Sequence, residues 1–227
     1  GIASDVSLGT GGLVGSRAAG GVLRALAARN DPAARVLVNE LVSKLKHEND
    51  IVACSAARAL GEAMSPSGGG VGATRACHGF EKPLFRQRFF AQTLPDVLTG
   101  LSSANAGPGG SQGRPAYIAA VVHLARHAPG SAVFQAGEKI LPLLPEAAAA
   151  LADSNSNFAD HQALAAAVVL LASFFSDQRG RKALEMHAEA HAGAMLRALC
   201  ALAGAGTQKS IETQSQASLE VRETALE

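Results

Sequence analysis

Two pairs of histidines have a spacing that would let both side chains of a pair reach one metal ion from one helix face. The pairs are His123 with His127 and His187 with His191, and imidazoles four residues apart are a known zinc-ligand arrangement. The zinc-protease motif also places a Glu directly after the first His, whereas here an alanine follows His187 and Glu189 comes one residue too late. Neither pair has an evident third ligand nearby, so we interpret all four as surface or boundary histidines.

The cysteines do not form a recognisable ligand set. Cys54, Cys77 and Cys200 lie far apart and are odd in number, and no Cys-x-x-Cys pair is present. The sequence therefore predicts neither a zinc or iron–sulfur site nor a disulfide framework, and this cysteine usage favours a reducing compartment.

The segment Gly204–Ser210 is similar to a phosphate-binding loop. A Walker A loop follows a strand and requires glycine at the positions that Ala203 and Gln208 hold here. The pattern before the segment predicts a helix instead, so we interpret it as a helix end followed by a loop. Acidic residues are scattered over predicted helix faces, where solvated charge is expected. We therefore predict no catalytic residue, no bound metal and no cofactor, and we expect that the chain is not an enzyme.

The composition indicates a helical protein that binds neither nucleic acid nor membrane. Of the 227 residues, 48% are apolar and 4% are aromatic, with no Trp and a single Tyr. Ala and Leu are good helix formers, and the alternation typical of strands is hard to find. The net charge of +1 comes from interspersed signs, and stacking aromatics are scarce, so no direct nucleic-acid contact is predicted. The longest uncharged apolar stretch, Gln162–Ser176, is shorter than the roughly 20 residues that span a bilayer and is predicted to be a core helix.

Glycine- and serine-rich segments divide the chain. Residues 1–21 are predicted to be disordered, and flexible insertions are expected at 65–76 and 102–113, because such segments cannot bury enough surface to offset their ordering entropy. Residues 22–227 are expected to form one domain. Because the chain starts at Gly1 without a Met and ends within a predicted helix, we interpret it as an excerpt of a longer protein.

Helical periodicity predicts a series of antiparallel helix pairs. Pro32 suits a first helical turn, and Asp50 suits an N-cap. The predicted helices are Pro32–His47, Ile51–Met64, Pro83–Leu101 with a kink at Pro95, Pro115–Ala128, Ala136–Asp153, Phe158–Phe175, Gln178–Ala203 and Gln214–Glu227. The pairs number about four to five, with the period of roughly 40–47 residues that HEAT repeats have. The sequence thus predicts an all-α, right-handed α-solenoid of HEAT-like hairpins, and a compact helical bundle is the alternative.

The helix predicted over Pro115–Ala128 is expected to be strongly amphipathic. Tyr117 and Leu124 lie in its apolar stripe, and His123 and His127 project from the other side. This pattern predicts one buried and one solvated face.

One part of the sequence carries a more specific pattern. It comprises Leu84–Phe90 (Leu-Phe-Arg-Gln-Arg-Phe-Phe), then Leu94-Pro95 and, after the second insertion, Arg114–Ile118 (Arg-Pro-Ala-Tyr-Ile). This pattern closely resembles the C-terminal domain of the MMS-nineteen family, the methyl-methanesulfonate-sensitivity or nucleotide excision repair proteins. The similarity is strong over Pro83–Tyr117 and weak elsewhere, and the spacer before Arg114 is longer here than in the family.

The resemblance implies a non-catalytic scaffold. Members of the family are long HEAT-repeat adaptors that join a WD-repeat propeller subunit and a small assembly subunit in cytosolic iron–sulfur assembly. That complex hands clusters to apo-proteins, many of them DNA repair and replication enzymes, and the adaptor is not known for ligating the cluster. By this resemblance, we expect the chain to dock both assembly subunits, to serve apo iron–sulfur client proteins, and to act in the cytoplasm and the nucleus.

The residues of the motif have two interpretations. Phe85 and Phe89 fall on one face of a helix, and Phe90 and Leu94 fall on an adjacent face. With Tyr117, these residues are predicted to pack between neighbouring repeats.

The two arginines of the motif, Arg86 and Arg88, would then lie near the rim. They either bridge adjacent repeats or bind an acidic partner, and we name them as candidate partner-binding residues.

Two alternatives to this scaffold function are open from the sequence alone. The chain could be part of an unrelated HEAT or armadillo scaffold, such as a transport or phosphatase subunit. From a different class of function, it could be the helical domain of a metal-dependent enzyme.

Overall fold

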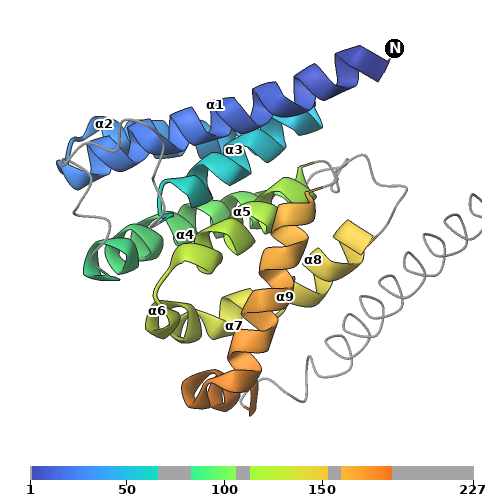
Figure 1. The fold of residues 1–227 in the computed structure, drawn as a ribbon. Coiled ribbons are helices and arrows are strands. Elements are labelled where there is room, and N and C mark those ends of the chain that lie inside the picture. Colours follow the sequence, from blue (N-terminus) through green and yellow to red (C-terminus); the bar gives the residue numbers. More distant parts are fainter. Residues whose placement is uncertain (1, 66–82, 106–112, 153–159, 186–227) are drawn as a thin grey trace, which may run out of the picture.

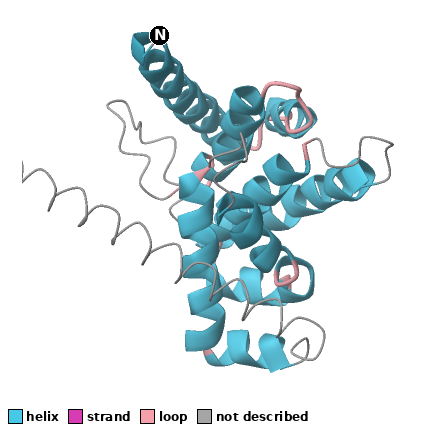
Figure 2. Ribbon diagram, turned by 90° about the vertical axis from the view of Figure 1, so that its right-hand side faces the viewer, coloured by secondary structure: helices cyan, strands magenta, loops and turns pink. Residues whose placement is uncertain are grey.

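The computed structural model describes residues 2–65, 83–105, 113–152 and 160–185. This part of the chain is helical and has no strand (Figure 1, Figure 2), which confirms the predicted all-α class. The helices are α1 (Ile2–Ala28), α2 (Ala33–Lys44), α3 (Asp50–Glu62), α4 (Pro83–Asn105), α5 (Arg114–His127), α6 (Gly130–Gln135), α7 (Gly137–Ile140), α8 (Leu143–Ala152) and α9 (His161–Ser176). Residues 178–185 are also helical.

The helices form two adjoining rows. In one row, α3 packs on α1, α5 packs on α3, and α9 packs on α5, and Figure 1 shows the first three of these helices lying one above another. In the other row, α2 contacts α4, and α4 contacts α6. Because α2 also packs on α3, α4 on α5, and α8 on α9, successive helices pair as hairpins that lie side by side.

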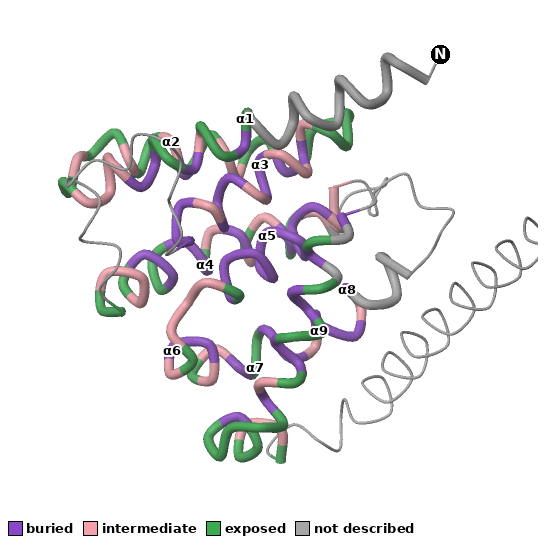
Figure 3. Tube along the Cα trace, in the orientation of Figure 1, coloured by how far each residue is buried: buried purple, intermediate pink, exposed green. Residues whose placement is uncertain are grey.

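Helix α5 is the centre of the core. Ten consecutive residues, Ala116–Ala125, are buried, and Figure 3 colours the central part of this helix as buried. The predicted amphipathic pattern is wrong here because α3, α4, α8 and α9 all pack against α5 and leave it no solvated face. His123, predicted to be at the surface or boundary, is buried with 4% exposure, whereas His127 is half-buried at the end of the helix.

Helix α1 covers most of residues 1–21, the stretch for which the composition predicted disorder. The helix begins at Ile2 and continues through this glycine-rich stretch. Gly20 faces α3 so closely that a Cβ added there would lie 2.7 Å from the Cβ of Glu62 and 2.9 Å from the carbonyl oxygen of Ala59. The glycine that lowers helix propensity therefore lets the two helices approach. Leu23, fully buried, fixes the contact one turn later.

Several helix ends differ from the prediction in detail. The N-cap of α3 is Asn49 rather than Asp50, and the Asn49 side chain accepts a hydrogen bond from the backbone N–H of Ile51 at 2.9 Å. Pro95 lies within one continuous helix, α4, and the hydroxyl of Thr99 donates to the Pro95 carbonyl at 2.8 Å.

The two predicted insertions lie mostly outside the described residues. In the first, 65–76, only residue 65 is described, and in the second, 102–113, residues 102–105 belong to α4.

The helix predicted over Ala136–Asp153 is divided into α7 and α8, with α6 before them. Pro142 and Pro145, which cannot donate backbone hydrogen bonds, lie between α7 and α8 and in the first turn of α8. Of the predicted helix Gln178–Ala203, residues 178–185 are helical, and its remainder and Gln214–Glu227 lie outside the described part.

None of the described helices combines the length and the hydropathy that crossing a bilayer requires.

Candidate functional site

The motif residues lie on α4 and α5 and contribute mainly to the core. Phe89, Phe90 and Leu94 are buried, with exposures of 7%, 2% and 5%, and Phe85 is half-buried. Tyr117 on α5 is 4% exposed. Its ring lies against Gly100 of α4, where an added Cβ would come within 2.3 Å of the ring, so α4 and α5 approach closely at this point. Burial also raises the pKa of the Tyr117 phenol.

The two arginines of the motif have different environments. Arg86 is half-buried, and its Nη1 donates to the backbone carbonyl of His127 at 3.1 Å. It thereby satisfies one of the free carbonyls at the C-terminus of α5. Arg88 is exposed, and within the described part of the chain its guanidinium has no hydrogen-bond or ion-pair partner. The partner-binding function of both residues stays a prediction.

His127 lies beside this arginine. Burial, and then the neighbouring charge of Arg126, lower the pKa of its imidazole to about 4, and the charge of Arg86 acts in the same direction. At neutral pH the ring is therefore uncharged, as its position among arginines requires.

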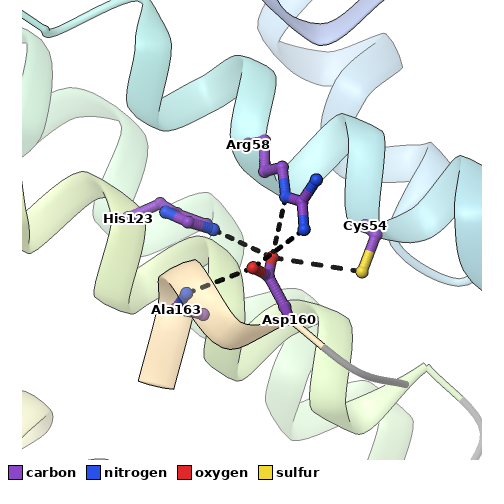
Figure 4. A network of polar contacts seen from close by, with 5 residues as sticks. All are labelled: Cys54, Arg58, His123, Asp160 and Ala163. Atoms are coloured by element: carbon purple, nitrogen blue, oxygen red, sulfur yellow. Dashed lines mark hydrogen bonds and ion pairs between the residues drawn. The ribbon is translucent and has the colours of Figure 1, made fainter. Parts of the chain in front are cut away.

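A second cluster of polar residues lies inside the molecule, where α3, α5 and the start of α9 meet (Figure 4). Asp160 is fully buried and is the N-cap of α9, with one carboxylate oxygen accepting from the backbone N–H of Ala163 at 3.1 Å. Arg58 of α3 donates from Nε at 3.2 Å and from Nη2 at 3.1 Å. The Nε2 of His123 on α5 lies 3.0 Å from Asp160 Oδ2. One carboxylate thus ties three helices together.

The electrostatics of this cluster favour a permanently charged Asp160. Burial alone would raise the pKa of the carboxyl, but the hydrogen bonds and charges of His123 and Arg58 outweigh it and hold the pKa well below its usual range. The thiol of Cys54 lies 4.0 Å from Asp160 Oδ2. Burial, and then the charge of Asp160, raise the pKa of Cys54 to about 12.

The chemistry of this cluster is structural. The cluster contains Cys54, His123 and Asp160, the side-chain types of a nucleophilic triad. However, the thiol is protonated at neutral pH and the imidazole Nε2 is directed at the carboxylate (Figure 4), so no nucleophile is activated. No group of three potential ligands suited to a metal ion occurs in the described residues. The arrangement holds a buried ion pair between helices.

Other arginine side chains also make polar contacts between helices. Arg24 of α1 donates from Nε to the carbonyl of Ala63, just after α3, at 3.2 Å. Arg35 of α2 pairs with Asp96 of α4 at 2.7 Å.

Further along the chain, Arg114 donates to both carboxylate oxygens of Glu146 on α8. This hydrogen bonding raises the pKa of the Arg114 guanidinium. Such bidentate pairs fix orientation as well as distance.

Surface grooves lie along the row formed by α2, α4 and α6. Between α2 and α4 lies a hollow of about 580 Å³, with Asn39, Ser43 and Lys46 on one wall and Thr99 and Ser103 on the other. Between α4 and α6–α7 lies a smaller one of about 260 Å³, hereafter the α4 groove. Its lining includes Gln87, Phe90, Ala91, Leu94, Pro95, Ala132, Gln135, Ala136, Glu138 and Lys139.

Comparison with models of known protein families shows which family the chain belongs to. The family model MMS19_C, described as the C-terminal part of an RNAPII transcription regulator, matches residues 21–227. The chain belongs to the MMS19 C-terminal family. This confirms the resemblance seen in the motif and removes the alternative of an unrelated scaffold. Neither the curated proteins nor the solved structures contain a match to the chain.

The buried cluster of this MMS19 C-terminal chain was missed by the sequence reasoning. Asp160 lies within the predicted helix Phe158–Phe175, whereas α9 begins after it, at His161, with Asp160 as the N-cap. Arg58 is a charged residue within the alanine-rich run Ala53–Ala63, and a charge within a small-residue helix face is a signal for a buried pair. The partnership with His123 had no signal, because 37 residues separate the two positions.

Proposed function

We propose that this chain is the C-terminal segment of a non-catalytic adaptor that docks the subunits of the cytosolic iron–sulfur targeting complex. The observation that carries the proposal is the family match, which runs from residue 21 to residue 227. The partners in this proposal are the WD-repeat propeller subunit and the small assembly subunit. The complex would deliver clusters to apo iron–sulfur proteins of DNA repair and replication, in the cytoplasm and the nucleus.

We further propose that the helices are a section of a right-handed HEAT-like α-solenoid. The support is the order of packing, in which α2–α3, α4–α5 and α8–α9 form consecutive hairpins and each contacts the next. In a solenoid each repeat contacts its neighbours, and stacking the repeats buries a continuous core. The row α1, α3, α5 and α9 has this arrangement.

The described surface favours binding over catalysis. The buried polar cluster is occupied by its own ion pair, whereas α4 presents the free guanidinium of Arg88 next to an apolar groove. Exposed arginine and apolar anchors beside a groove are typical of protein-binding surfaces.

The proposal is tested by capture of the two purified assembly subunits on the immobilised 227-residue chain. We expect both subunits to be retained at low salt and progressively less at high salt, because Arg88 contributes an exposed charge. The variant Arg88→Glu should weaken capture while leaving the melting temperature unchanged. Arg126→Glu is the matched control, since Arg126 is an exposed arginine on α5 that lies beside residues of α6 and α9 and does not line the α4 groove. A folded chain that retains neither subunit would overturn the proposal.

A further inference from the structure

The α4 groove has the size and the lining of a site for a single side chain. Its volume of about 260 Å³ lies just below the roughly 300–1,000 Å³ of pockets that enclose small-molecule ligands. The floor is apolar, formed by Phe90, Leu94, Ala132 and Ala136. A large aliphatic or aromatic side chain of a partner would bury this apolar floor.

Two amide side chains line the groove, one from each wall. Gln87 belongs to the α4 wall and Gln135 to the α6 wall, and neither amide makes a hydrogen bond to another described residue. Each carboxamide offers two donors and one acceptor. An extended peptide does not pair its own backbone N–H and C=O groups with one another. The two carboxamides, one on each wall, could therefore form hydrogen bonds with these groups.

The charge at the edge of the groove is positive. Arg88 is exposed and lies three residues before Ala91 of the groove lining, so the two are neighbours on the helix surface. On the other wall, Glu138 and Lys139 are adjacent and opposite in charge. Among the described residues, the guanidinium of Arg88 is then the charge at this edge that has no opposite charge paired with it. Leu84, 64% exposed, lies one turn before Arg88 and extends the apolar edge.

We propose that the α4 groove binds an extended segment of a partner protein in which one large apolar residue is flanked by acidic residues. The apolar side chain fills the groove, the two glutamines bond the backbone on either side, and an acidic side chain meets Arg88. A helical segment fits less well, because it satisfies its own backbone and would need several apolar anchors in a row. The inference rests on the proposed adaptor function, since it assigns a surface by which the adaptor would hold a partner.

The probe is a fluorescein-labelled peptide of sequence Gly-Pro-Ser-Asp-Leu-Asp-Ser-Pro-Gly, whose prolines prevent a helix. Its affinity for the 227-residue chain is measured by fluorescence polarisation. We expect saturable binding that weakens about tenfold or more when the central Leu is replaced by Ser, given the free energy of burying one Leu. Replacing both Asp residues by Lys should weaken it about threefold to tenfold at low salt.

Variants of the chain locate the site. Ala91→Trp places a large ring in the groove from an exposed helix position and should weaken peptide binding at least about tenfold. Gln135→Trp should do the same from the opposite wall. Ser102→Trp is the matched control, because Ser102 is exposed on the same helix and does not line the groove; it should leave binding unchanged. Melting temperatures show that each variant is folded.

Three outcomes would overturn the inference. These are no peptide binding at millimolar concentration, binding that neither groove variant weakens, and tighter binding of an Ala-rich helical peptide carrying the same Asp-Leu-Asp. The capture experiment separates this failure from failure of the adaptor function. If the wild-type chain captures the assembly subunits but does not bind the peptide, only the groove assignment is wrong. If the wild type captures neither subunit, the adaptor function itself is wrong.

Discussion

Replacing Asp160 by Ala should strongly destabilise the fold. The carboxylate is fully buried and accepts hydrogen bonds from Arg58, His123 and the backbone N–H of Ala163. Its removal leaves the guanidinium of Arg58, whose side chain is 19% exposed, without its partner. Breaking a buried pair in this way costs about 3–5 kcal/mol of unfolding free energy. Loss of the N-cap accounts for about 1 kcal/mol of this total.

The assay is thermal and urea unfolding followed by circular dichroism. For a chain of this size a loss of about 3–5 kcal/mol corresponds to a fall in melting temperature of roughly 6–20 °C. Asp177→Ala is the matched control. Asp177 also accepts a backbone hydrogen bond, from Arg179 at 2.7 Å, but it is exposed and has no arginine side-chain partner in the described residues. That variant should lose no more than about 0.5–2 kcal/mol.

The pH dependence of stability provides an independent test at the same residue, with the variant Asp160→Asn. Because the folded pKa of Asp160 is depressed, the carboxylate stabilises the fold fully above its unfolded pKa of about 3.9. This stabilisation is lost as the pH falls below about 4 toward the folded pKa. Asp160→Asn should therefore flatten the stability profile in this acid range. If Asp160→Ala melted within a degree or two of Asp177→Ala, the ion pair would not be what fixes α9 on α3 and α5.

Four further measurements follow from other sites. Phe89→Ala should cost about 3–5 kcal/mol, because the ring is only 7% exposed, and urea unfolding measures it; a cost below about 1 kcal/mol would contradict the core assignment. Gly61→Val should also destabilise the fold, since a Cβ there would lie 2.6 Å from the Cβ of His123; unchanged melting would show that α3 and α5 can separate without penalty. Cys54, with its pKa near 12, should be alkylated at pH 8 far more slowly in the folded than in the unfolded chain, as peptide mapping would show, and equal rates would contradict its burial. His127→Leu should flatten the stability profile between about pH 6.5 and 4, because the folded imidazole, with a pKa of about 4, loses its stabilising neutrality as the pH falls through that window; a profile identical to the wild type would contradict this.

The parts of the fold that the sequence predicted are those where local pattern and tertiary environment agree. The helix containing Phe89, Phe90 and Leu94 has one buried face, and its periodicity predicted both the helix and the burial of these residues. The N-terminal proline of the next predicted helix likewise marked the start of α5. In these elements the chain neighbours of a residue suffice to predict its environment.

The parts that the sequence did not predict depend on what packs against each helix. In α5 the pattern of small and large residues indicated one apolar stripe, but four surrounding helices bury the opposite side as well. In α1 glycine indicated disorder, whereas Gly20 serves the close approach to α3. Propensity measures the cost of forming a helix, and it does not include the packing that offsets this cost.

The two arginines of the motif show the same limit at the level of function. Their spacing in the sequence is two residues, so residue type alone gave both the same candidate function. The structure directs Arg86 to the C-terminus of α5 and leaves Arg88 exposed beside the α4 groove. Arg86 is therefore a poor site for a binding test, because its substitution would remove the hydrogen bond to His127 and loosen α4 from α5. Arg88 is exposed beside the α4 groove and can be changed with the fold intact, so a loss of binding in an Arg88 variant can be assigned to the surface rather than to unfolding.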